Sequence, residues 1–199
     1  MHLVLTEEPK QEIISLREAK NYLRVDHDFD DELITELIKT SRELMESVTE
    51  KSILKQTWQY VIEKGADENF NWVSTDTPNF SEYVMTIPLP RPPVIKIISV
   101  SIGDEILGSS QYRSENIGSK FYLYLSLRHR VNSGKRKSIT IVYDAGMTDV
   151  PAKVPSQLKL ANLMILANAY QERYSLSRNN LISQGIRQLL NPFMELRLF

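Results

Sequence analysis

The densest group of reactive side chains in this sequence is four aspartates within six residues, Asp26, Asp28, Asp30 and Asp31. Carboxylates at alternate positions are how calcium-binding loops begin. The rest of that pattern is missing, because Asp31 stands where the loop needs glycine and Leu37 where it needs a bidentate glutamate. The same carboxylates directly precede an amphipathic stretch, where they would favour the positive end of a helix. We therefore favour helix capping over cation binding for this cluster.

Other residue types that catalyse reactions or bind metals are sparse. The three histidines, His2, His27 and His129, are far apart in sequence, and none has a partner at metal-ligand spacing. The seven glycines form no phosphate-binding cluster. The chain has no cysteine, which excludes disulfides, thiolate metal sites and a cysteine nucleophile. We expect no enzyme activity and neither a metal nor another cofactor.

A run of cationic residues surrounds a turn sequence in the second half of the chain. Asn132, Ser133 and Gly134 favour a turn, so the run predicts a hairpin tip with positive side chains. One interpretation is a solvated tip that protects a strand edge; the other is a contact with DNA phosphates or an acidic partner. The cationic residues of this predicted basic tip are Arg128, Arg130, Lys135, Arg136 and Lys137.

The last residues of the sequence are apolar to an unusual degree. A monomer rarely exposes such residues at its end. The segment either packs on the protein's own core or inserts, as a hook, into another subunit or partner. The residues of this predicted hook are Leu189, Leu190, Pro192, Phe193, Leu196, Leu198 and Phe199.

Composition places the chain among ordinary globular proteins. Of its 199 residues, 42% are hydrophobic and 25% are charged, and the net charge is -1. There is no global positive field to draw the molecule onto nucleic acid. The acidic first residues do not fit a signal peptide, and the longest apolar-rich run, residues 158–170, is too short to span a bilayer. We expect a cytosolic product.

Two helices are expected near the start of the chain. Ser15 and Glu18 have the spacing of a capping box, which predicts a short helix through about Leu23. A second helix should follow the aspartates, with one face to bury and one exposed to water. Its apolar positions are Leu33, Ile34, Leu37, Ile38, Leu44, Met45 and Val48, and its expected wet face is Glu32, Glu36, Lys39, Arg42, Glu43 and Glu46.

The middle of the chain has strand character. Trp58, Tyr60 and Ile62 alternate with other strand formers, and similar short runs recur as far as Tyr143. Residues 88–93 contain four prolines, which predicts a stiff, extended segment that cannot be a central strand. From residue 156 onward the apolar positions wrap most of a helix, and a weaker helical stretch covers residues 181–190.

These patterns predict an α+β fold. The N- and C-terminal helices should form a helical bundle, with an antiparallel β region of about six short strands inserted between them. The expected divisions are residues 1–52 for the N-terminal helical part, 53–148 for the β-rich insertion and 149–199 for the C-terminal helices and tail. The helical parts should pack together, so that the chain is one integrated body.

Several segments, taken in order, resemble the head–tail connector (adaptor) proteins of long-tailed bacteriophages and prophages. The resemblance is to the longer branch of that family, which has a strand-rich insertion. Each segment alone is weak, but the series in register covers most of the chain. The matching segments are residues 14–20, 23–26, 30–34, 56–58, 87–93, 141–146, 154–155 and 190–193.

The resemblance implies a structural protein without catalytic residues. Subunits of that family are expected to form a ring, often of twelve copies, beneath the portal protein in the virion neck, after assembly in the cytoplasm of the host bacterium. The ring extends the channel through which DNA passes without sequence specificity, and it offers a surface to the tail-completion or stopper proteins. The C-terminal hook would engage the portal, and the isolated subunit can be a monomer.

Three other functions remain open at this stage. One is another neck component, such as a head completion, stopper or tail-completion protein; those are expected to be shorter and richer in strands. Another is a nucleic-acid-binding module, which the net charge of -1 and the lack of a recognisable reading helix disfavour. The last is a metal-dependent enzyme, which clustered carboxylates would reveal.

Overall fold

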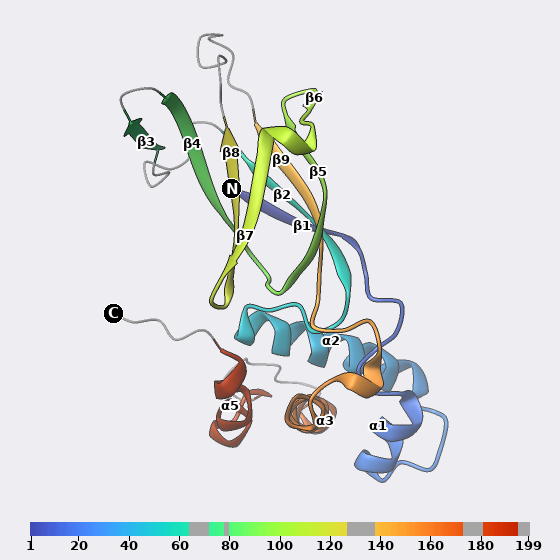
Figure 1. Cartoon of the computed structure of the whole chain (residues 1–199). Coiled ribbons are helices and arrows are strands. Elements are labelled where there is room, and N and C mark those ends of the chain that lie inside the picture. The colour runs from blue at the N-terminus through green and yellow to red at the C-terminus, as the bar shows by residue number, and fades with distance from the viewer. Residues whose placement is uncertain (64–71, 78–79, 127–137, 173–180, 195–199) are drawn as a thin grey trace. The chain divides into compact units, whose positions relative to one another are not determined.

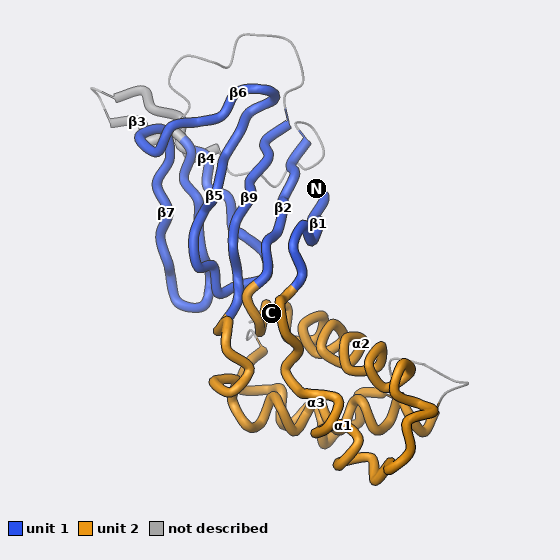
Figure 2. The backbone as a smooth tube through the Cα atoms, turned by 90° about the vertical axis from the view of Figure 1, so that its right-hand side faces the viewer, with its two compact units in different colours: residues 1–8, 56–146 blue, residues 9–55, 147–199 orange. Residues whose placement is uncertain are grey.

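The computed structural model describes residues 1–63, 72–77, 80–126, 138–172 and 181–194. The chain divides into two compact units (Figure 2). The sheet unit consists of residues 1–8 and 56–146, and the helical unit consists of residues 9–55 and 147–199. The chain therefore crosses between the units three times, and each unit is built from segments far apart in the sequence.

The sheet unit contains one sheet of five antiparallel strands (Figure 1). In spatial order these are β1 (His2–Glu7), β2 (Gln56–Ile62), β9 (Ile139–Ala145), β5 (Val94–Ile102) and β6 (Glu105–Ile106). The register places Leu5 opposite Trp58, and Trp58 opposite Tyr143 on its other side. The first strand of the chain is thus an edge of this sheet.

A second antiparallel sheet has four strands. They are β3 (Trp72–Thr77), β4 (Phe80–Leu89), β8 (Lys120–Ser126) and β7 (Tyr112–Ile117), again in spatial order. Pro88 lies in β4 opposite Tyr122 of β8, beyond the last pair of β4 with β3 at Met85. The proline therefore occupies a stretch of β4 with a ladder partner on one side only, as is usual for a residue without a backbone donor.

The two sheets share one apolar core, as in a sandwich. Tyr143 is fully buried in it, and its hydroxyl donates to the carbonyl of Pro90 at 2.7 Å. Burial raises the pKa of Tyr143 well above its ordinary value. The buried residues of this core are Tyr60, Ile62, Met85, Ile87, Leu89, Val94, Val100, Phe121, Leu123, Leu125, Ile139, Ile141, Tyr143 and Ala145.

Two bulges interrupt the pairing of β5 with β9. The register skips Ile95, between Val94 and Lys96, and skips Ile98 further along the strand. A bulge turns the extra residue out of the regular alternation. Both isoleucines are consequently half exposed, each at 50%. The apolar sequence of β5 predicts a buried strand, but the two bulges leave these two isoleucines exposed to solvent.

The helical unit is built from segments on both sides of the sheet unit in sequence. Its α-helices are α1 (Leu16–Leu23), α2 (Asp31–Thr49), α3 (Ser156–Gln171) and α5 (Gln184–Leu190), with short 3₁₀ turns η2 (Pro151–Lys153) and η3 (Asn191–Phe193). A further 3₁₀ turn, η1 (Ser109–Gln111), belongs to the sheet unit. The predicted capping box of α1 is present, because the Glu18 amide donates to Ser15 Oγ at 3.3 Å and the Ser15 amide donates to Glu18 Oε2 at 2.7 Å.

The core of the helical unit is aliphatic. Its buried residues are Ile13, Ile14, Ala19, Ile34, Leu37, Ile38, Met45, Ile53, Leu54, Val154, Leu158, Ala161, Ile165, Leu166, Ala169, Leu181, Ile182, Ile186 and Leu190. They come from α1, α2, α3 and α5 and from the segments that flank these helices. Most of the predicted apolar face of α2 is buried or partly buried, as its spacing predicts, but the prediction is wrong for Leu33 because its exposed fraction is 37%.

The predicted fold class, a helical bundle with an inserted region of about six short strands, is wrong. The described residues form nine strands in two antiparallel sheets, and they form four α-helices. The β region is not an insertion between helices, because β1 (His2–Glu7) precedes α1 and completes the five-stranded sheet. The partner of β1 is β2, about fifty residues further along, and a non-local pairing of this kind leaves little trace in the local sequence.

Candidate interaction surfaces

The described residues contain no group of three or more His, Cys, Asp or Glu side chains arranged to hold a metal ion. Within the same part of the chain, no helix combines the length and the apolar character needed to cross a lipid bilayer. The described residues also contain exposed apolar side chains, an acidic loop held by ion pairs and an open hollow. These are features of a surface that contacts other macromolecules.

The predicted acidic cluster forms a loop between α1 and α2, which we call the acidic elbow (residues 26–31). Lys20 Nζ lies 2.7 Å from Asp28 Oδ1 and 2.7 Å from Asp31 Oδ1, so one ammonium group joins both carboxylates. The hydrogen bond from Lys20 holds the pKa of Asp28 below its ordinary value, and the same contacts raise the pKa of Lys20. Lys20 therefore braces the elbow against α1 and offsets part of the negative charge of its four aspartates.

Asp30 is the N-cap residue of α2, but it makes no side-chain capping hydrogen bond. Its carboxylate Oδ2 instead accepts from the hydroxyl of Tyr170, in α3, at 2.5 Å. The helix-capping interpretation is therefore wrong for Asp30, because a phenol from a distant helix competes for its carboxylate. Asp31 lies in the first turn of α2, where its charge suits the helix dipole.

Phe29 is the most conspicuous residue of the elbow, and sequence analysis missed it as a candidate. Its exposed fraction is 95%, although it is a large apolar residue. Its ring centroid lies 5.6 Å from that of His27. The signal in the sequence is an aromatic residue enclosed by aspartates, in a segment that no core periodicity includes.

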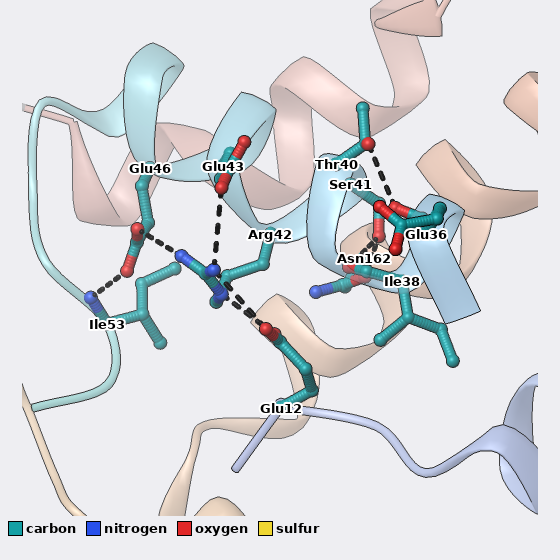
Figure 3. A network of polar contacts seen from close by, with 10 residues as sticks. All are labelled: Glu12, Glu36, Ile38, Thr40, Ser41, Arg42, Glu43, Glu46, Ile53 and Asn162. Atoms are coloured by element: carbon teal, nitrogen blue, oxygen red, sulfur yellow. Dashed lines mark hydrogen bonds and ion pairs between the residues drawn. The ribbon is translucent and has the colours of Figure 1, made fainter. Parts of the chain in front are cut away.

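A buried ionic network holds the segments around α2 together (Figure 3). Arg42 Nε donates to Glu12 Oε2 at 2.7 Å, and Nη1 donates to Glu46 Oε2 at 3.0 Å. Glu46 Oε1 also accepts from the Ile53 amide at 2.7 Å. Burial by itself lowers the pKa of Arg42, but the bond to Glu12 and the charge of Glu46 reverse this, and the net shift is upward.

The expected wet face of α2 is consequently wrong at two positions. Arg42 and Glu46 are buried, with side-chain exposed fractions of 1% and 5%, whereas Glu43 is half exposed. Helical periodicity places Arg42 among polar neighbours and gives no sign of Glu12, which covers it from the segment that precedes α1. Only the tertiary fold reveals this ion pair.

A second buried polar contact joins α2 and α3. Ser41 Oγ lies 2.6 Å from Asn162 Oδ1 and 2.8 Å from the carbonyl of Ile38. Asn162 is fully buried, and its Nδ2 has no hydrogen-bond partner among the described residues. One polar pair therefore interrupts an otherwise apolar helix interface.

An open hollow of about 460 Å³ lies in the helical unit at the N-terminal end of α1. Its apolar lining comes from Ile13, Ile14, Leu16, Ile38, Pro151 and Ala152, and its polar lining comes from Gln11, Glu12, Ser15, Glu18, Thr35 and Lys159. Two of its carboxylates are already engaged: Glu12 binds Arg42, and Glu18 closes the capping box. We call this feature the α1 hollow.

The residues of the predicted hook divide into two groups. Leu190 is buried in the helical core, while Leu189 and Phe193 pack against that core partly buried. Pro192 is exposed. The other three, Leu196, Leu198 and Phe199, lie outside the described residues, as does the whole predicted basic tip: Arg128, Arg130, Lys135, Arg136 and Lys137.

A protein-family model described as "HCP: Head completion protein" matches residues 12–185. Three solved structures contain similar chains, each covering 100% of this chain and 98% of its own length. They are the neck of an empty GTA particle computed with C6 symmetry (TM-score 0.74, 14% identity), the virion of a native gene transfer agent (GTA) particle (0.71, 13%) and the neck of a native GTA particle computed with C12 symmetry (0.70, 13%). At these identities the likeness shows a shared fold. No curated protein sequence matches the chain.

Proposed function

The chain belongs to the head completion protein family, and on this premise we propose that it is a structural subunit of the neck of a tailed phage, a prophage or a related particle. Several copies form a ring beneath the portal, extend the DNA channel and offer a docking surface to the tail. Assembly takes place in the cytoplasm of the host bacterium. The observation that carries this proposal is the family match over residues 12–185, which includes parts of both compact units.

The solved structures support the ring. Their chains share this fold over nearly their whole length, and two of them belong to necks computed with sixfold and twelvefold symmetry. A ring subunit must present two different surfaces, one to each neighbour, because head-to-tail contacts are heterologous. We propose twelve copies in the particle, with the free subunit a monomer until it meets the portal.

The exposed apolar residues of both units support a role in assembly. The helical unit exposes Tyr22, Phe29 and Leu33, and β5 of the sheet unit exposes Ile95 and Ile98. Isolated exposed apolar residues are common, but clusters of them on ordered elements mark interaction sites. A structural subunit without catalytic residues is the function that best accommodates this surface.

The C-terminal hook is the proposed contact with the portal. The packing of Leu189, Leu190 and Phe193 on the helical core supports a fixed anchor point for the residues beyond Met194. A segment that orders on docking offsets its ordering cost by burying apolar area. In this proposal Leu196, Leu198 and Phe199 supply that area.

The basic tip is the proposed contact with DNA in the channel. The net charge of the chain is -1, so attraction to phosphates must come from a local cluster such as Arg128 to Lys137. Each subunit of the ring would contribute the five cations of its basic tip, and together the tips would surround the channel with positive charge. Contacts of this kind neutralise phosphates and read no sequence.

A different position in the neck, as a stopper or tail-completion protein, is the competing proposal. The observation that favours it is the strand content, because nine strands in the described residues weaken the argument that long helices exclude such a role. The two proposals differ in the partner: a connector binds the portal directly, and a stopper binds the connector.

The experiment that tests the proposed function is co-purification. The full chain is co-expressed with the portal protein of the same genome, and separately with its neighbouring neck proteins, and the portal is captured by an affinity tag. We expect the portal to retain the chain without other neck proteins. Retention only when a further neck protein is present would favour the stopper, and absence in all arms would refute both.

A further inference from the structure

The acidic elbow and the α1 hollow lie at opposite ends of α1, and we propose that the elbow of one copy seats in the hollow of the next, with Phe29 as the anchor. This inference rests on the proposed ring. Both features belong to the helical unit, so the contact needs no particular arrangement of the two units. It is heterologous, with different surfaces on the two sides, as a closed ring requires.

The elbow has the properties of a preformed anchor. Phe29 is 95% exposed and has a ring contact with His27, so its ring has little contact within its own chain to lose on binding. The loop that carries it is braced on both sides, because Lys20 binds Asp28 and Asp31, and Tyr170 binds Asp30. Aromatic anchors on rigid supports contribute disproportionately to interfaces, since little freedom remains to be lost.

The α1 hollow has the properties of a receptor for an aromatic ring. Six of its twelve lining residues are aliphatic or proline, and its volume of about 460 Å³ is open to solvent. Its lining combines an apolar surface with polar edges, the usual character of an interface core and its rim. Exposed Ala152 and half-buried Leu16 leave part of that apolar lining accessible to a partner.

Charge complementarity indicates that the acidic elbow of a second copy occupies the α1 hollow. Asp28 and Asp30 flank Phe29 in sequence, and Asp26 and Asp28 are exposed. Lys159 lines the hollow, and the exposed charged residues next in sequence to other lining residues are three cations, Lys10, Arg17 and Lys153, and one carboxylate, Glu36. The hollow's carboxylates are engaged by Arg42 and by the Ser15 cap. An acidic knob and a basic-rimmed hollow on the same chain favour a second copy of this chain as the partner, through attraction that also fixes orientation.

The first test is the assembly of Phe29→Ser on the portal protein of the same genome, followed by electron microscopy. Because Phe29 makes so little contact with its own chain, the variant should fold normally by circular dichroism. We expect about a tenfold or greater loss of ring at a fixed concentration. Ile106→Ser, which removes another largely exposed apolar side chain, is the matched control and should assemble normally. Rings at the wild-type level with Phe29→Ser would overturn the inference.

The second test uses the absence of cysteine from the chain. Copies with His27→Cys are mixed with copies with Ala152→Cys, on the portal, under mild oxidation; any disulfide then joins two copies, and Phe29 is retained. We expect a crosslinked dimer from this pair and none when Ala152→Cys is replaced by Ile106→Cys. No crosslink in assembled rings would overturn the elbow contact and leave the ring standing, whereas a wild-type chain that forms no ring would overturn both.

Discussion

The Arg42 guanidinium and the Glu46 carboxylate form an ion pair one turn apart in α2, with Nη1 3.0 Å from Oε2. Both side chains are almost completely withdrawn from solvent. The second oxygen of Glu46 accepts from the Ile53 amide, and the other side of the guanidinium binds Glu12. The pair therefore fastens the segments before α1 and after α2 to the middle of the helical unit.

Removal of Arg42 should be strongly destabilising. Arg42→Ala leaves the Glu46 carboxylate buried without its cation, and breaking a buried pair in this way costs about 3–5 kcal/mol. Urea unfolding of the full chain measures the loss. Glu43→Gln is the control, because Glu43 is half exposed and 3.7 Å from Arg42; it should change the free energy of unfolding by less than about 1 kcal/mol. Equal, small effects of the two substitutions would contradict the assignment of Arg42 as the hub.

Removing one residue of the buried Ser41–Asn162 pair should destabilise the protein more than replacing both residues. Ser41→Ala removes the partner of a fully buried Asn162, and an unpaired buried amide costs about 1–3 kcal/mol. The double variant Ser41→Ala with Asn162→Leu replaces both polar groups, and it should recover most of that loss. A double-mutant cycle by chemical denaturation measures the coupling. If the double variant is as unstable as the sum of the single variants, the two side chains are not coupled.

The α1 capping box should make stability depend on acid pH. The hydrogen bond from the Ser15 amide holds the pKa of Glu18 below its ordinary value. A lowered folded-state pKa means that this stabilisation is complete above the unfolded value of about 4.3 and is lost as the pH falls through the folded value. Glu18→Gln keeps an acceptor but no charge, so it should be less stable than the wild type at neutral pH by about 0.3–1 kcal/mol. Thermal unfolding across the acid range should show this difference shrinking toward zero; a difference that grows on acidification would contradict the cap.

We expect the C-terminal segment to have two roles: residues 191–194 stabilise the helical unit, and residues 195–199 bind the portal. Deletion of residues 195–199 removes none of the described core and should leave the unfolding free energy nearly unchanged while portal binding is lost. Deletion from Asn191 onward also removes Phe193 and Met194, which pack against the helical core, and should destabilise the unit by about 1–3 kcal/mol. Denaturation and portal capture of both truncations are the measurements. Unchanged portal binding by both would refute the hook.

The helical elements could be predicted because their determinants are local. The capping box of Ser15 and Glu18 and the apolar spacing of α2 are legible in short windows, and the structure contains both. The strands were harder to predict. β1 has a half-alternating pattern of six residues, and the two bulges of β5 turn Ile95 and Ile98 out of the regular period. The fold class was wrong because a sheet partner chosen across about fifty residues is not encoded nearby.

The sequence predicts the positions of some surface features, but not the tertiary contacts that determine their roles. The acidic elbow was visible as a cluster, but its physical role depends on Lys20 and Tyr170, and Tyr170 is far away in sequence. Arg42 was predicted as a solvated residue because its cover, Glu12, comes from another segment. The exposure of Phe29 is a property of the folded chain, although the aspartates on either side of it are visible in the sequence. The basic tip and the last hook residues stay predictions, since they lie outside the described residues.

The central claim is that this chain works as one of many copies in a ring on the portal. The most direct measurement is electron microscopy of the full chain bound to the portal protein of the same genome, with the copy number and symmetry determined from the particles. We expect a closed ring of the chain, with sixfold or twelvefold symmetry, coaxial with the portal channel. Single, unordered copies on the portal, or no association at all, would contradict it.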